Sequence, residues 1–336
     1  MDDFSPPLPP PLPEAAPAEL PAFLQSVALL RDMRRAVGAV VLGQAEVVDQ
    51  VLVAFIAGGH ILLEGKPGLG KTHLVLALAA TFGGLFRRIQ FTPDLMPSDV
   101  TGHSLYDLGR QEFRLKRGPI FCNLLLADEI NRAPAKTQAA LLEVMQENQV
   151  TLDGQTLPLA PPFMALATQN PIEQEGTYAL PEAQLDRFLM KVLVDYPSSD
   201  HEEAIVVGST TGGDGLSPSH LAPFASAQDI LDLQALAAAV TCVPEVISYA
   251  VRLVRATRSS PSLALGAGTR GAIALVKVAK AFALLEGRAY VTPDDIKAAA
   301  LPVLRHRVAL SPELAIGGQQ VDDCLAELLR STPAPR

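Results

Sequence analysis

The sequence is poor in the residues that build disulfide frameworks and zinc sites. Its 336 residues include three cysteines and six histidines. Cys122, Cys242 and Cys324 stand far apart, and no CxxC, HxxxH or HExxH spacing occurs. We therefore expect reduced thiols, as in a cytosolic protein, and the spacing gives no indication of zinc.

Long hydrophobic runs are also missing. The longest unbroken apolar segments, 51–57 and 74–80, are far shorter than the roughly 20 residues that a membrane-spanning helix needs. The first twenty residues are acidic and proline-rich, without the basic start and apolar centre of a secretory signal. These features predict a cytoplasmic protein without a membrane span.

Basic residues are the minority. The chain has 27 Lys and Arg against 36 Asp and Glu, which gives a net charge of −9. Binding to a phosphate backbone would need a local basic patch that works against this overall field. Nucleic acid is therefore not an expected partner.

The chain divides into four parts by pattern. Residues 1–21 carry too many prolines to propagate a helix, so we expect a mobile tail; a PxxP docking peptide is the alternative. Residues 22–197 alternate short buried runs with amphipathic helices, which predicts an α/β core with a parallel sheet covered on both faces. Residues 198–330 predict a smaller all-helical domain, and residues 331–336 a flexible tail.

The α/β part has five expected strands and two expected hairpins. The strands are 60–64, 88–91, 123–127, 163–167 and 188–194. One hairpin spans 105–115, and the other turns at Asp153-Gly154, a pair that tolerates the positive φ angles of a tight turn.

The sequence of the helical part shows an apolar stripe on one expected helix and the start of another helix. The stripe consists of Val246, Ile247, Ala250, Val251 and Val254. A helix is expected to begin at 292–295, where a threonine cap, a proline and two aspartates follow one another. A Gly/Ser/Pro-rich connector at 209–219 is expected to be a surface loop.

The segment "GKPGLGKT" fits the pattern G-x-x-x-x-G-K-[ST], and it stands between a strand and a helix. Its glycines let successive backbone N–H groups face phosphate oxygens at a helix N-terminus. Lys71 would reach the β- and γ-phosphates of ATP, and Thr72 would offer a hydroxyl to Mg²⁺. The remaining residues expected to bind nucleotide are Gly65, Pro67, Gly68, Leu69 and Gly70. The alternative is a chance glycine-rich turn.

Polar residues end two later strands. Asp128 would steady Mg²⁺, and Glu129 would orient or deprotonate the attacking water; alternatively, both carboxylates only solvate a strand end. Asn170 would bridge that water and the γ-phosphate, or it only caps a turn. The order of the three motifs favours the catalytic interpretation.

This order, with "DEINRA", "TQNP" and "LPEAQLDRF", resembles the MoxR family of AAA+ ATPases over about residues 22–330. The two hairpins resemble the inserts of the clade that contains the magnesium chelatase ATPase subunit and the MCM helicases. The resemblance implies an AAA+ core followed by a helical lid. It also implies ATP and Mg²⁺ as cofactors, and a ring of identical subunits, expected to be a hexamer.

The resemblance also implies residue roles. Arg187 would be an arginine finger for the neighbouring subunit, although an ion pair with Asp186 or Glu182 is the alternative. Arg270 would be the sensor-2 arginine. Both cis and trans action are open for it, because this chain has Gly268-Thr269 where many relatives have Ser-Pro. Gly43 and Gln44 would lie beside the adenine, or form a plain loop.

Other basic residues have two interpretations. Arg132 is either a subunit contact or a solvated charge. Arg110, Arg114, Lys116 and Arg117 on the first hairpin either touch a client or form a solvated face.

Three functions follow for comparison. The first is an ATP-driven chaperone that remodels or matures client proteins with a separate von Willebrand A-domain partner, as the resemblance implies. The second is a DNA-linked motor, which the acidity opposes. The third is a nucleotide-switched scaffold with little turnover, which the presence of Glu129 and Arg187 opposes.

Overall fold

A five-stranded parallel sheet forms the centre of the molecule, with strand order β2-β5-β8-β1-β9. The computed structural model describes residues 19–66, 68–107, 109–169, 178–210 and 217–335. The strands are β1 (Ile61–Glu64), β2 (Phe86–Gln90), β5 (Leu124–Asp128), β8 (Met164–Gln169) and β9 (Met190–Leu193). All five predicted strands are confirmed, with small shifts at their ends.

Each central strand is apolar on both faces because both faces are covered. In β1, Ile61 and Leu63 belong to one hydrophobic cluster and Leu62 to another. The first face is covered by α1 (Glu19–Val40), α2 (Ala45–Ile56) and α3 (Lys71–Phe82). The opposite face is covered by α4 (Pro97–Thr101) and α5 (Ala135–Glu147). This arrangement is the αβα core that the sequence predicted.

The C-terminal part is mostly helical. It consists of α7 (Ser199–Thr210), α8 (Ala227–Ala239), α9 (Pro244–Ser259), α10 (Thr269–Leu285), α11 (Pro293–Leu304), α12 (Pro312–Ile316) and α13 (Val321–Ser331). The predicted start of α11 is confirmed, because Thr292 caps it and forms a capping box with Asp295.

The prediction of an all-helical second domain is wrong in one detail. Two short strands, β10 (Leu263–Leu265) and β11 (Ala309–Leu310), pair antiparallel within it. Strands this short carry too few residues for an alternating pattern to be legible in the sequence.

The predicted stripe on α9 is narrower than expected. Val246, Ala250 and Val254 are buried, whereas Ile247 and Val251 are 41% and 42% exposed. The helix turns these two side chains away from the core that buries the other three.

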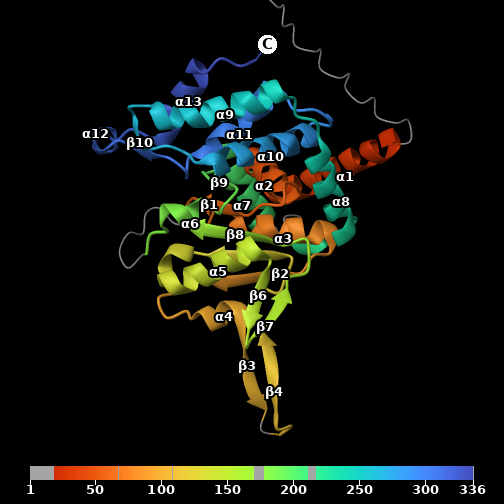
Figure 1. Cartoon of the computed structure of the whole chain (residues 1–336). Coiled ribbons are helices and arrows are strands. Elements are labelled where there is room, and N and C mark those ends of the chain that lie inside the picture. The colour runs from red at the N-terminus through yellow and green to blue at the C-terminus, as the bar shows by residue number, and fades with distance from the viewer. Residues whose placement is uncertain (1–18, 67, 108, 170–177, 211–216, 336) are drawn as a thin grey trace, which may run out of the picture.

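In the part of the chain that the structure describes, the helical part shares its core with the sheet. One hydrophobic cluster runs from α1, α2 and α3 through the sheet to α8, α9, α10 and α11. α10 packs on α2, and α11 packs on β9. Figure 1 shows these helices stacked above the sheet.

Two antiparallel hairpins confirm the predicted inserts. The first pairs β3 (Gly102–Asp107) with β4 (Glu112–Arg117) and projects from the end of the core opposite the helical part (Figure 1). The second pairs β6 (Gln149–Leu152) with β7 (Gln155–Pro158), and its turn has positive φ angles of 49° at Asp153 and 79° at Gly154.

The predicted ends of the chain differ from the structure in two places. α1 begins at Glu19, so it includes the last three residues of the predicted tail, while 1–18 lie outside the described residues. At the other end, Arg252 donates a hydrogen bond to the carbonyl of Pro333, and Ala334 packs against the core. The described part of 331–336 is therefore in contact with α9. Within the described ranges, no helix has the length and apolar character that crossing a membrane requires.

Candidate nucleotide-binding site

The glycine-rich loop lies where β1 meets the N-terminus of α3, at the carboxyl edge of the sheet. Gly70 caps α3 with φ 75°, and Gly68 has φ 83°, so both use backbone conformations that favour glycine. At Gly65 a Cβ atom would lie 2.3 Å from the carbonyl oxygen of Val194. The loop therefore needs glycine at two positions for its turn and at a third for its contact with the end of β9.

Lys71 begins α3 and folds back over the loop. Its Nζ donates a hydrogen bond of 2.5 Å to the carbonyl of Gly65. Burial lowers the pKa of Lys71, whereas the nearby charges of Asp128, Glu129 and Glu64 oppose that shift. The ammonium group thus lies within the electrostatic field of three carboxylates.

Asp128 ends β5, and both of its carboxylate oxygens have partners. The hydroxyl of Thr168 on β8 donates to Oδ1 at 2.6 Å. Arg88 on β2 donates to Oδ2 from Nη2 at 2.6 Å and from Nε at 3.2 Å. The two neighbouring strands of the sheet therefore fix the orientation of this carboxylate.

Glu129 follows directly in a left-handed conformation, with φ 56°. Its backbone N–H donates to the hydroxyl of Thr168 at 2.8 Å. Its Oε2 accepts a hydrogen bond of 2.8 Å from Gln90 and lies 3.1 Å from Nε of Arg132. Thr168 therefore joins both acidic residues, and Gln90 and Arg132 hold the glutamate by one oxygen.

The other end of the cleft lies between the start of α2 and the segment that follows β9. Gln44, at the N-cap of α2, donates to the carbonyl of Asp195 at 2.6 Å. Gly43 has φ 74° and packs against Pro197, where a Cβ atom would lie 2.7 Å from the proline ring. Next to them Tyr196 is 54% exposed, and the ammonium of Lys66 lies 4.6 Å from its ring centroid.

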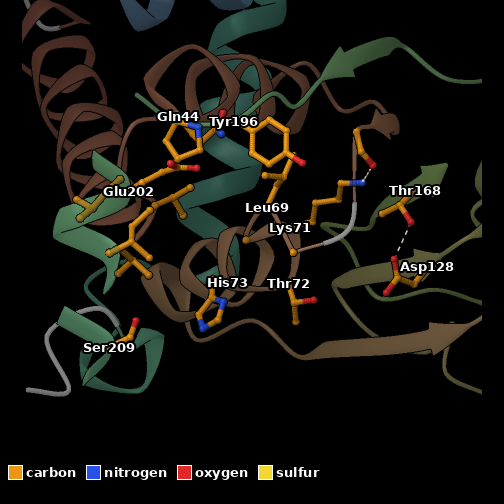
Figure 2. Close-up of a pocket in the computed structure, with 18 of the residues that line it drawn as sticks. Gln44, Leu69, Lys71, Thr72, His73, Asp128, Thr168, Tyr196, Glu202 and Ser209 are labelled. Atoms are coloured by element: carbon orange, nitrogen blue, oxygen red, sulfur yellow. Dashed lines mark hydrogen bonds between the residues drawn. The ribbon is translucent and has the colours of Figure 1, made fainter. Parts of the chain in front are cut away.

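One cleft of about 890 Å³ is lined by most of these groups, including Lys71, Asp128, Gln44 and Tyr196, whereas Gly43, Lys66 and Arg132 are not part of its lining. Figure 2 shows Lys71 between the Thr168–Asp128 pair and the end that contains Gln44 and Tyr196. Helix α7, which the sequence assigned to the second domain, contributes Glu202, Ile205, Val206 and Ser209. The remaining lining residues that bear on the argument are Gly65, Gly68, Leu69, Gly70, Thr72, Arg88, Gln90 and Glu129.

The two arginines expected to contact nucleotide do not line this cleft. Arg187 follows α6 (Glu182–Leu185), and its guanidinium makes no ion pair with any residue that the structure describes. Arg270, at the start of α10, has a side chain that is 60% exposed and lies 3.4 Å from Asp186. Asp186 also pairs with Arg307 at 2.8 Å. The alternative ion pair of Arg187 with Asp186 or Glu182, both of which the structure describes, is not formed.

Two residues expected at the site, Pro67 and Asn170, lie outside the described residues. The other predicted cleft residues, from both the glycine-rich loop and the acidic pair, are brought together by the fold.

Comparison with known proteins gives a consistent result. The model of the ATPase family associated with various cellular activities matches residues 60–190, and the AAA lid domain model matches residues 255–327. Chaperone MoxR1 of Mycobacterium tuberculosis is 45% identical over 82% of this chain and 77% of its own length. The chain belongs to the MoxR family of AAA+ ATPases.

Further relatives agree with this membership. Protein MoxR of Paracoccus denitrificans is 33% identical over 85% of this chain and 90% of its own length. YeaC of Bacillus subtilis, described as uncharacterized, is 47% identical over 88% and 92%. A crystal structure of a candidate ATPase from Cytophaga hutchinsonii has a TM-score of 0.87 at 41% identity, covering 95% of this chain and 98% of its own. ATP hydrolysis is thus the activity of this MoxR-family chain.

Sequence reasoning did not find several cleft residues of this MoxR-type ATPase. Thr168, Arg88 and Gln90 contact the acidic pair only because β2, β5 and β8 are neighbours in the sheet. The one available signal was Thr168, a polar residue inside an otherwise apolar buried run. Tyr196 gave no signal, because it follows the last strand like any loop residue.

Proposed function

We propose that this MoxR-type ATPase works as a ring, expected to be a hexamer, in which a neighbouring copy completes each nucleotide site. Hydrolysis would drive the remodelling or maturation of a client protein, together with a separate protein that carries a von Willebrand A domain. The name of the relative Chaperone MoxR1 supports the chaperone part of this proposal.

The observation that carries the proposal is the separation of the arginines from the cleft. The cleft contains the glycine-rich loop, Lys71 and both acidic residues, but neither Arg187 nor Arg270. Asp186 precedes Arg187 in the chain and lies 3.4 Å from Arg270, so Arg270 is close to the chain segment that carries Arg187. This proximity supports the proposal that both arginines act at the site of the next subunit, and we propose the trans role for Arg270 as well.

Residues of the cleft fit a magnesium ion bound with the triphosphate. Mg²⁺ takes oxygen ligands and keeps several waters. The Thr72 hydroxyl lies in the first turn of α3, and Asp128, whose oxygens are bonded by Thr168 and Arg88, is placed to hold metal-bound water. A bound Mg²⁺ would neutralise negative charge on the β- and γ-phosphates.

Glu129 is proposed to orient or deprotonate the attacking water. Gln90 and Arg132 both contact Oε2, so they fix the carboxylate without using Oε1. Oε1 is then the oxygen that can accept a hydrogen bond from water. Lys71, with the loop N–H groups, would hold the phosphates in place for that attack.

Three substitutions test the proposal. Lys71→Ala should abolish ATP binding, Glu129→Gln should bind ATP but hydrolyse it at least about a hundredfold more slowly, and Arg187→Ala should bind ATP and lose ring-stimulated turnover. The measurements are ATP affinity and turnover per subunit across a dilution series. Turnover per subunit that stayed constant at every dilution, or that stayed ring-dependent in Arg187→Ala, would contradict the proposal.

A client can be sought with the same variant. Glu129→Gln holds ATP without completing the cycle, so a bound client should remain on it during purification. Recovery of the same protein with Glu129→Gln and not with Lys71→Ala is the expected result.

A further inference from the structure

Residues 186–189, the finger segment, connect α6 to β9 and include Arg187. The core holds this segment by its N–H groups: Leu189 donates to the carbonyl of His60 at 2.7 Å, and Phe188 donates to Leu185 at 3.0 Å. The Phe188 side chain is fully buried in the core cluster around α5.

The carbonyl groups of the finger segment are held from the other side, by Arg307. Its Nη2 donates to the carbonyl of Phe188 at 2.6 Å, and its Nη1 donates to that of Leu189 at 3.1 Å. Its Nε donates to the carboxylate of Asp186 at 2.8 Å. Two further hydrogen bonds go from Nη2 to the carbonyl of Asp186 at 3.4 Å and from Nη1 back to the carbonyl of Val303 in α11. One guanidinium therefore spans the residues on both sides of Arg187.

Arg307 is built into the lid rather than into the core. It follows the C-terminal end of α11, its side chain is 4% exposed, and the neighbouring His306 lies 3.0 Å from the carbonyl of Phe188. Two residues earlier, Arg305 pairs with Asp322 of α13 at 2.8 Å and donates to the carbonyl of Lys191 on β9 at 3.1 Å. The residues at the C-terminal end of α11 thus hydrogen-bond to the finger segment and to the start of β9.

We infer that Arg307 is the positioning residue of Arg187: it ties the finger segment to the lid of its own subunit, so that the lid sets where the finger reaches into the next subunit. This inference rests on the proposed trans role of Arg187. Only an arginine can serve here, because its planar fork carries donors in several directions at once. A lysine would keep the charge but place all its donors on one nitrogen.

The test uses Arg307→Lys in assembled enzyme with ATP. Turnover should fall at least about tenfold, while ATP affinity should change by less than about threefold, because the variant's own cleft is intact. Full turnover in Arg307→Lys would overturn the inference.

A mixing experiment separates positioning from general damage. Glu129→Gln subunits have an inactive site but an intact finger, so a Glu129→Gln neighbour should restore hydrolysis at the intact cleft of an Arg307→Lys subunit. In a random 1:1 mixture about a quarter of wild-type turnover should return, because the head-to-tail contacts of a ring pair each cleft with one neighbour. A mixture of Arg307→Lys with Arg187→Ala should stay inactive, since neither supplies a working finger.

The reference mixture is Arg187→Ala with Glu129→Gln. Recovery in the reference without recovery in the Arg307→Lys mixture would overturn this inference and leave the proposed function standing. No recovery in the reference would overturn the trans finger itself.

Two further variants control for folding. Arg288→Lys removes a comparable fork, which binds Asp295 inside the lid at 2.6 and 2.8 Å, and it should keep wild-type turnover. If Arg307→Lys does not fold, Asp186→Asn is used instead, because it weakens the same contact to Arg307 from the core side. Asp186→Asn should then be rescued by Glu129→Gln, and a failure of that rescue would overturn the inference.

Discussion

At the scale of single residues, Thr168 organises the acidic pair of the cleft. Its hydroxyl donates to Asp128 and accepts from the backbone of Glu129, and the residue is 2% exposed. A hydroxyl can do both at once because it has one donor and two lone pairs. The hydroxyl therefore ties the carboxylate of Asp128 to the backbone of Glu129.

Thr168→Val keeps the shape of this side chain and removes both hydrogen bonds. We expect turnover to fall about tenfold or more and the free energy of unfolding to fall by about 1–3 kcal/mol, because the N–H of Glu129 loses its partner. Steady-state ATPase assays and urea titrations measure the two effects.

The matched control is Thr257→Val in the lid. Thr257 is also buried, donates to the carbonyl of Val254 at 2.6 Å and accepts from the N–H of Ala267 at 2.9 Å. It should lose similar stability while keeping its turnover. Equal losses of turnover in both variants would mean that Thr168 acts only through stability.

Sequence reasoning identified the residues of the cleft better than their partners. The loop glycines, Lys71 and the acidic pair are recognisable because their chemistry requires a fixed spacing along the chain. Arg88 and Gln90 are not, because an exposed arginine or glutamine on a strand has no distinctive pattern until β2 is paired with β5. The role of such residues depends on the order of the strands in the sheet.

At the scale of elements, two glycines of the glycine-rich loop disfavour alanine for different reasons. At Gly70 the space is open and only the positive φ opposes alanine, whereas at Gly65 the carbonyl of Val194 stands in the way. Gly70→Ala should therefore cost about 1–2 kcal/mol of stability, and Gly65→Ala should cost more because β9 has to shift.

Urea titration and ATP affinity check this order. The control is Gly38→Ala within α1, where nothing lies within 4 Å of the added carbon. It should raise stability by about 0.5–1 kcal/mol, since alanine is the better helix former. A smaller loss in Gly65→Ala than in Gly70→Ala would contradict the explanation by contact.

The elements themselves were predictable to different degrees. The five sheet strands stand out because both faces are covered and each strand is a buried apolar run. The β10–β11 pair and the exposed positions of Ile247 and Val251 did not stand out, because they depend on which neighbouring helix covers which face. Tertiary packing decided these features, and local pattern could not.

At the scale of the whole molecule, His60 makes stability depend on pH. Its Nδ1 accepts from the N–H of Ala165 at 3.0 Å, its other nitrogen lies 2.8 Å from the carbonyl of Met145, and burial lowers its pKa from 6.5 to about 4. The unfolded chain therefore binds a proton at His60 near pH 6.5, whereas the folded chain binds it only near pH 4. Stability is complete above that pH and declines as the pH falls towards 4.

Between pH 7.5 and pH 5 this histidine should remove about 2 kcal/mol of stability. Urea titrations at both pH values, at constant subunit concentration, measure the loss. His60→Gln has no proton to gain and should show a loss smaller by about that amount. An unchanged loss in His60→Gln would place the pH dependence elsewhere.

The projecting β3–β4 hairpin also has a practical consequence. Its tip carries Phe113, which is 75% exposed and stacks edge-on against Tyr106 at 5.1 Å, outside both hydrophobic clusters. The chain contains no tryptophan. The variant F113W would thus introduce the sole indole of the molecule. The wavelength of its fluorescence emission would report when the hairpin tip leaves water, without tryptophan background from the ATPase core.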